Sequence, residues 1–433
     1  MRIIFCVACF CLTATAFANP EVPGAPQKKP AAITGATIHP VSRPVIEGGT
    51  LVFDKGKIAA LGKDVTVPAD AEVIDAAGKH VYPGLFDALT DLGLVEINSI
   101  RATIDGLEVG QLNPNVRALV AVNPDSEIIP VTRANGVLLA LAAPYGGLMS
   151  GRSAVIQLDG WTWEDLALAG DAGMHIQWPQ YGAGGRGRRG GTPPSQAGPP
   201  RSEQAIEQLR QALTDARAYG AARQADPNFP RDARWESLQD VVGGKLPVII
   251  HADDLRQLHA AVAFAQREKL KLIVAGGYDA RECLPLLKKH DVPIIVGGTY
   301  RLPRRRGDAY DSAYALPAAL HAAGIRYCIG TQGRFGASNV RNLPYHAAAA
   351  IGFGLPADEA LKAITLYPAQ ILGASARVGS LEVGKDATLI IADGDVLDTP
   401  TQVTAAWIAG RKVELNDRHK RLYRKYEQKY QQP

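Results

Sequence analysis

Short apolar segments alternate with amphipathic ones through the middle of the chain. Residues 137–141 and 246–251 are runs typical of buried strands, whereas residues 255–268 place apolar side chains at helical spacing. The same alternation continues through strand patterns at 270–274, 292–296 and 326–329 and helix patterns at 281–290 and 315–323. Regular alternation of this kind predicts parallel strands joined by crossover helices. Residues 83–375 are long enough for an α/β fold of the (β/α)8 TIM-like barrel type.

Both ends of this region carry a different pattern, in which short strands are separated by turns. Strand patterns occur at residues 32–38, 49–53, 57–61, 384–391 and 403–413. We therefore expect a small β-sandwich domain formed from both chain ends, comprising residues 32–82 and 376–415. Residues 416–433 are charged and rich in tyrosine, which predicts a C-terminal helix on the surface. That helix either is simply solvated or binds a partner.

Composition and charge exclude some classes of protein. The 433 residues are 46% hydrophobic and 21% charged, as in globular proteins, and the net charge of +4 is small for a nucleic-acid-binding protein. Residues 1–18 combine a basic start, a short apolar run and a small-residue cleavage pattern, which predicts a signal peptide and a periplasmic or secreted protein. Residues 19–31 are expected to form a linker. No later stretch is apolar enough to predict a membrane span.

Two arginine-rich segments interrupt the alternation. Residues 181–200 are rich in glycine, arginine and proline, so we expect a flexible insert in the barrel. Arg304, Arg305 and Arg306 follow a predicted strand, on the side of a barrel where ligands bind. These three arginines are therefore candidates for binding an anion.

Several motifs point to a known family. Val81–Asp91, with the sequence VYPGLFDALTD, resembles the segment that opens the barrel in the amidohydrolase superfamily, particularly its imidazolonepropionase-like and dipeptidase-type members. Residues 48–58, 366–373 and 378–387 resemble further segments of that family, in the family's order. The resemblance implies a barrel framed by a β domain from both ends. It also implies a hydrolase that cleaves carbon–nitrogen bonds of amides or cyclic amides with a metal-bound hydroxide.

The residues at the family's functional positions depart from its pattern. The family's first ligands form a His-x-His pair, and this chain has Leu89 and Asp91 there. His251 matches the family histidine of the fifth strand, but Ala275 replaces that of the sixth. Gln332 occupies the place of the catalytic aspartate of the eighth strand, and a glutamine cannot act as a general base.

The family's ligand on the fourth strand has no clear counterpart. Met174–Trp178 is a candidate strand near that point, with His175 and Gln177 on one side. Directly after His251, Asp253 or Asp254 is expected to cap a helix, and the alternative is a functional role of these acids at the mouth of the barrel.

A degenerate metal site follows from these replacements. Catalytic zinc normally has three protein ligands, and His251 and Asp91 supply two at best. We therefore expect no cofactor, or zinc or another divalent metal if the protein is active. The alternative for His251 is a buried, hydrogen-bonded side chain with no ligand role.

Three hypotheses remain open. The first is an inactive or impaired amidohydrolase-like protein that binds a small-molecule or peptide-like ligand or supports an active partner. The second is an active hydrolase with a non-standard site, for which Asp91, His251 and Gln332 are the candidate catalytic residues. The third is an envelope interaction protein that uses the arginine-rich insert and the C-terminal helix. The family resemblance also leaves open a homo-oligomer, or a hetero-oligomer with an active relative.

Overall fold

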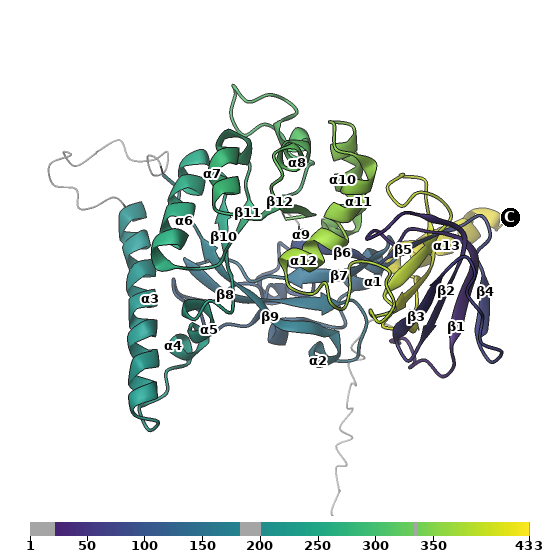
Figure 1. Ribbon diagram of the computed structural model, residues 1–433, viewed down its shortest axis with the longest axis horizontal. Helices are drawn as coiled ribbons and strands as arrows, with labels where there is room; N and C mark the ends of the chain where they lie inside the picture. Colours follow the sequence, from purple (N-terminus) through teal and green to yellow (C-terminus); the bar gives the residue numbers. More distant parts are fainter. Residues whose placement is uncertain (1–21, 182–200, 333–335, 433) are drawn as a thin grey trace, which may run out of the picture.

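Two eight-stranded sheets organise the chain (Figure 1). The computed structural model describes residues 22–181, 201–332 and 336–432. The expected signal peptide, residues 1–18, and nearly all of the expected insert lie outside the described residues. Within the described ranges, no helix is long and apolar enough to cross a membrane.

The first sheet joins the two ends of the chain, as expected. Its strands are β1 (Ala31–Ile38), β2 (Ile46–Asp54), β3 (Lys57–Gly62), β4 (Glu72–Asp75), β5 (His80–Pro83), β14 (Leu389–Ala392), β15 (Val403–Ile408) and β16 (Arg411–Val413). Antiparallel pairing of β5 with β14 connects the early strands to the late ones. Phe53 on β2 meets Trp407 on β15 edge to face at 5.8 Å, although three strands separate them in the sheet. The sandwich-like core is thus enclosed by one curled sheet.

The second sheet forms the barrel. Its strands are β6 (Leu85–Thr90), β7 (Val137–Ala142), β8 (Met149–Gln157), β9 (Ala167–Gln177), β10 (Val248–Ala252), β11 (Leu272–Gly276), β12 (Ile294–Gly297) and β13 (Tyr327–Gly330), and they are neighbours in chain order. Pairing is parallel except that β8 runs antiparallel to both β7 and β9. The expected strict alternation of strand and helix is therefore wrong here. The connections on either side of β8 are too short for a crossover helix, so the chain turns back on itself.

Side chains bring the first and last barrel strands together. A carboxylate oxygen of Asp87 on β6 accepts a hydrogen bond from the backbone N–H of Thr331, just after β13, at 3.1 Å, and the Thr331 hydroxyl donates to the other oxygen. A Cβ atom on Gly330 would lie 3.1 Å from the backbone nitrogen of Leu89, so a side chain there would crowd β6. The sheet is thereby nearly closed.

Helices cover the outside of the barrel, except α13, which lies beside the first sheet (Figure 1). They are α1 (Ile128–Arg133), α2 (Trp163–Leu166), α3 (Arg201–Ala225), α4 (Ala233–Ser237), α5 (Gln239–Val242), α6 (Leu255–Glu268), α7 (Leu284–Lys289), α8 (Ser312–Ala322), α9 (Gly336–Asn339), α10 (Leu343–Ile351), α11 (Ala357–Ala363), α12 (Leu366–Ile371) and α13 (Arg418–Gln431). Short 3-10 turns are η1 (Arg101–Thr103), η2 (Ala118–Ala121), η4 (Ala280–Cys283) and η5 (Val340–Asn342).

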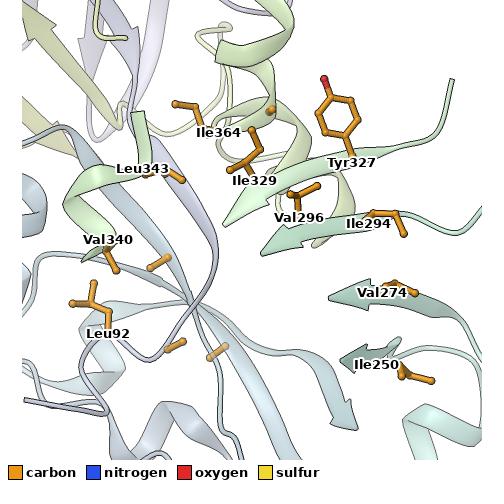
Figure 2. Close-up of a cluster of buried hydrophobic side chains, with 14 of the residues drawn as sticks. Leu92, Ile250, Val274, Ile294, Val296, Tyr327, Ile329, Val340, Leu343 and Ile364 are labelled. Carbon is orange, nitrogen blue, oxygen red and sulfur yellow. The ribbon is translucent and has the colours of Figure 1, made fainter. Parts of the chain in front are cut away.

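Alternation along the strands separates two apolar layers. Figure 2 shows part of the outer layer, in which strand residues such as Val274 and Ile329 belong to the same buried cluster as Leu343. Ile249 and Ile273 belong to a separate cluster inside the barrel. Side chains two residues apart on a strand share a face. The residues that follow Ile249 and Ile273 by two positions, His251 and Ala275, therefore also face the inside of the barrel, nearer its end.

Candidate functional site

A cavity of about 280 Å³ lies at the carboxyl ends of the barrel strands. It is lined by Leu89, Thr90, Asp91, Asn98, Ala143, Pro144, Tyr145, His251, Gln332 and Gly336. The three candidate catalytic residues, Asp91, His251 and Gln332, therefore lie in one cavity. Ligands of barrel proteins bind at this end, because the loops after the strands converge there.

His251 is the middle of a chain of three hydrogen-bonded side chains. It follows Ile249 by two residues on β10 and so faces into the barrel. Its Nε2 lies 2.8 Å from Nδ1 of His175 on β9, and its Nδ1 lies 3.0 Å from the side-chain amide nitrogen of Gln332. Both ring nitrogens of His251 are thus engaged by neighbouring side chains.

Burial keeps both imidazoles neutral. It lowers the pKa of His251 to about 4, with Asp253 acting in the opposite direction. Burial, followed by the neighbouring His251, holds the pKa of His175 well below its usual value. Nε2 of His175 is buried and has no hydrogen-bond partner among the described residues. The sequence placed His175 on a candidate strand near the family's fourth-strand ligand but did not predict its contact with His251. That contact joins residues on two different strands, so no local pattern indicates it.

Asp91 contributes to the same cavity a carboxylate with one unsatisfied oxygen. Its Oδ1 is buried and accepts no hydrogen bond from the described residues. Burial raises the pKa of Asp91, and hydrogen bonds from its own backbone and from that of Ala337 oppose the shift. A Cβ atom on Gly336 would lie 2.7 Å from Oδ1, so glycine lets the chain pass close to this oxygen.

The side chains around His251 do not fit a catalytic metal ion. Leu89 is a buried aliphatic side chain beside the cavity, and Ala275 pairs in register with His251 on the next strand. Neither has a donor atom where the family places histidine. The described part of the chain contains no group of three or more His, Cys, Asp or Glu side chains able to hold a metal, whereas catalytic zinc normally takes three protein ligands.

Asp87 is a buried acid that the sequence analysis did not single out. Burial raises its pKa to about 6, while hydrogen bonds from Thr331 and Leu89 act in the opposite direction. The sequence signal that could have identified Asp87 is an acidic residue within the otherwise largely apolar strand β6. Thr331 lies across the barrel seam, so Asp87 joins β6 to the segment after β13.

The arginines expected to bind an anion are largely paired with carboxylates. Arg305 lies 2.6 Å from Asp279 and 2.9 Å from Asp254, and Arg304 lies 3.4 Å from Asp253. These salt bridges compensate much of the charge of Arg304 and Arg305, and anion binding by the three arginines stays a prediction. Arg306 is exposed at the same loop.

The two aspartates after His251 have different partners. Asp254 is the N-cap residue of α6, as the capping hypothesis proposed. Asp253 accepts a hydrogen bond from the backbone N–H of Tyr278 at 3.2 Å and pairs with Arg301. Both aspartates therefore organise the loops around the barrel end.

The fold and cavity define a class: a β/α barrel protein with a cavity at its strand ends and a companion sheet from both chain termini. The Amidohydrolase family model matches residues 208–413. Imidazolonepropionase from Mesorhizobium japonicum is 25% identical over 403 residues, covering 88% of this chain and 92% of that protein. The crystal structure of an amidohydrolase from Thermotoga maritima has a TM-score of 0.79 at 24% identity, covering 89% of this chain and 99% of that one.

A further relative is much longer than this chain. Amidohydrolase tasK from Hapsidospora irregularis is 23% identical over 401 residues, which cover 84% of this chain but 39% of that protein. These matches indicate the same family as the motif at Val81–Asp91, and the barrel fold is consistent with that family. The family model, the sequence relatives and the structural match all support the amidohydrolase superfamily for this chain.

Proposed function

We propose that this protein binds a small amide-containing molecule at its barrel end and does not carry out metal-dependent hydrolysis there. The observation that carries the proposal is the hydrogen-bonded chain His175–His251–Gln332. In this chain of hydrogen bonds, His175 and Gln332 occupy both ring nitrogens of His251, the family histidine that this sequence retains. Leu89 and Ala275, which stand at two other ligand positions, offer no donor atoms.

The cavity suits a small ligand with both polar and apolar parts. Asp91 offers an unsatisfied acceptor for a ligand N–H, and Asn98 and Tyr145 add polar groups. Ala143 and Pro144 provide apolar contact on the same wall. An amide or cyclic amide presents a matching N–H donor and carbonyl acceptor, and this is also the bond class implied by the family. Gln332 can hydrogen-bond such a ligand but cannot accept a proton from water.

The alternative is an active hydrolase that acts on carbon–nitrogen bonds through Asp91 and His251. It is favoured by the raised pKa of the Asp91 carboxyl and by its position in the cavity that His251 also lines. A carboxyl group of raised pKa is suited to general acid–base catalysis. In this case Asp91 would exchange a proton with the substrate, and His251 would hydrogen-bond the substrate through Nδ1 in place of Gln332.

Metal analysis, turnover and ligand binding separate these functions. The purified protein and its His251→Ala variant are dialysed and analysed for bound metal, then assayed on amides, cyclic imides and dipeptides with and without chelator. We expect no stoichiometric metal and no turnover, together with saturable binding of an amide that Asp91→Ala abolishes and exposed Asp70→Ala retains. A tightly held metal that His251→Ala loses, or turnover that a chelator stops, would overturn the proposal. Turnover insensitive to chelator and lost in Asp91→Asn would instead support the alternative.

A reverse experiment tests the same reasoning. Leu89→His, Asp91→His, Ala275→His and Gln332→Asp together restore the donor types that the family carries at these positions. We expect this variant to bind zinc at a stoichiometry that the parent does not reach, measured by elemental analysis after dialysis. Equal zinc content in parent and variant would show that the four positions do not decide metal binding.

A further inference from the structure

The outward face of α13 carries exposed aromatic side chains. Tyr423, Tyr426 and Tyr430 are spaced three and four residues apart and are 68%, 51% and 82% exposed. At 3.6 residues per turn, this spacing places the three rings on one side of the helix. Leu422, which is 41% exposed, borders the same side. We call these four side chains the tyrosine face.

The helix is attached to the rest of the molecule through its other side. Arg421 pairs with Glu127 at 3.0 Å, and the Lys420 ammonium group donates to the backbone oxygen of Leu415 at 2.8 Å. Asp417 caps the start of the helix by accepting hydrogen bonds from the backbone N–H groups of His419 and Lys420. Because these contacts are polar and no residue of α13 is buried, the core does not require the tyrosine face. Figure 1 places α13 beside the sheet formed from both chain ends.

Basic side chains flank the tyrosine face. The helix contains one acidic residue, Glu427, and six basic ones: Arg418, Lys420, Arg421, Arg424, Lys425 and Lys429. Lys429 lies over the ring of Tyr430, 5.6 Å from its centre. Two copies of so basic a helix would repel each other, which argues against self-association through this face. A negatively charged surface is its electrostatic complement.

We propose that the tyrosine face and its flanking basic residues bind the surface of a bilayer that contains acidic phospholipid. Tyrosine is enriched at membrane–water interfaces because its ring is apolar and its hydroxyl is polar. Lysine and arginine stems lie along apolar surface while their charged ends reach the headgroups. Leu422 is the one aliphatic side chain on the tyrosine face, so an apolar protein groove would gain little from it. A bilayer with acidic headgroups attracts the basic side chains and also offers the tyrosine rings an interface in which to bind.

Vesicle co-sedimentation of the full chain tests this proposal. The protein is mixed with vesicles of phosphatidylcholine alone or with added phosphatidylglycerol, at low and high salt. We expect binding to the acidic vesicles alone, weakened by salt. Reversing three charges with Arg418→Glu, Lys425→Glu and Lys429→Glu is expected to weaken that binding by about tenfold or more. Changing the three tyrosines to serine is expected to weaken it without removing its salt dependence.

A matched control separates the helix from overall charge. Lys28→Glu, Lys63→Glu and Lys271→Glu change the net charge equally at exposed sites elsewhere, and these changes should leave binding unaltered. Circular dichroism and urea unfolding verify that every variant is folded. Equal loss of binding in the control, equal binding to both vesicle types, or no binding to either would overturn the proposal. So would capture by immobilised polyglutamate without vesicle binding, which would indicate an acidic protein partner.

Discussion

Asp87 is fully buried between the first and last strands of the barrel. Its Oδ1 accepts hydrogen bonds from the backbone N–H groups of Leu89 on its own strand and of Thr331 across the seam. Burial raises its pKa from 3.8 to about 6. The folded protein therefore keeps this proton up to about pH 6, whereas the unfolded chain releases it near its ordinary pKa. The free energy of unfolding should fall as the pH rises through that interval and become level above it.

Asp87→Asn removes this ionisation while retaining the shape of the side chain. Relative to the parent, the free energy of unfolding of the variant should rise by about 2 kcal/mol between about pH 4 and pH 7, because the parent alone acquires a buried charge. Urea unfolding at both pH values measures the difference. Asp70→Asn, at an exposed carboxylate, is the control. A stability gap that does not change with pH would contradict the assigned shift.

At the scale of elements, α6 depends on one buried glutamine at its first turn. The side-chain oxygen of Gln257 accepts hydrogen bonds from the backbone N–H groups of Asp253 and Asp254, each at 3.1 Å. Its amide nitrogen donates to the backbone oxygens of Trp178 and Pro179, just after β9. This side chain therefore fixes the segment that follows His251 and joins α6 to the end of a neighbouring strand.

Gln257→Ala should lower the free energy of unfolding by about 3 kcal/mol, because it leaves several backbone groups without partners in a buried position. Gln266→Ala makes the same substitution at an exposed site of the same helix and should change stability by no more than about 0.5 kcal/mol. Chemical denaturation of the two variants gives the comparison. Equal effects would mean that the contacts of Gln257 contribute nothing beyond helix propensity.

Across the whole molecule, Asp159 connects the barrel to the companion sheet. Its side chain is 1% exposed and lies 3.3 Å from Arg133 on α1 and 3.2 Å from Arg411 on β16. The backbone N–H of Gly24 also donates to it, at 3.2 Å. One buried carboxylate thus holds two arginines that come from different parts of the chain.

Asp159→Ala should lower the free energy of unfolding by about 3 to 5 kcal/mol, since it leaves two guanidinium groups without their buried partner. Asp291→Ala removes a carboxylate from an exposed pair with Arg326 and should cost less than about 1 kcal/mol. Thermal and urea unfolding of both variants can be compared directly. Similar losses in the two would show that Asp159 does not couple the two sheets.

The sequence by itself determined the positions of the elements. Apolar runs and turn residues located β10, β11, β12 and α6, since these signals act between residues close in the chain. The motif at Val81–Asp91 led to the family and to the departures at Leu89, Ala275 and Gln332. The direction of β8 was not predicted, because it depends on the short connections to β7 and β9.

Tertiary structure alone decided which of these side chains meet and what charge they carry. The contact of His175 with His251 and that of Asp87 with Thr331 join residues far apart in sequence, and no local pattern encodes them. The pairing of Arg305 with Asp279 likewise depends on two loops that only the closed barrel brings together. A pKa follows from burial and neighbours, and both exist only after the strands have assembled.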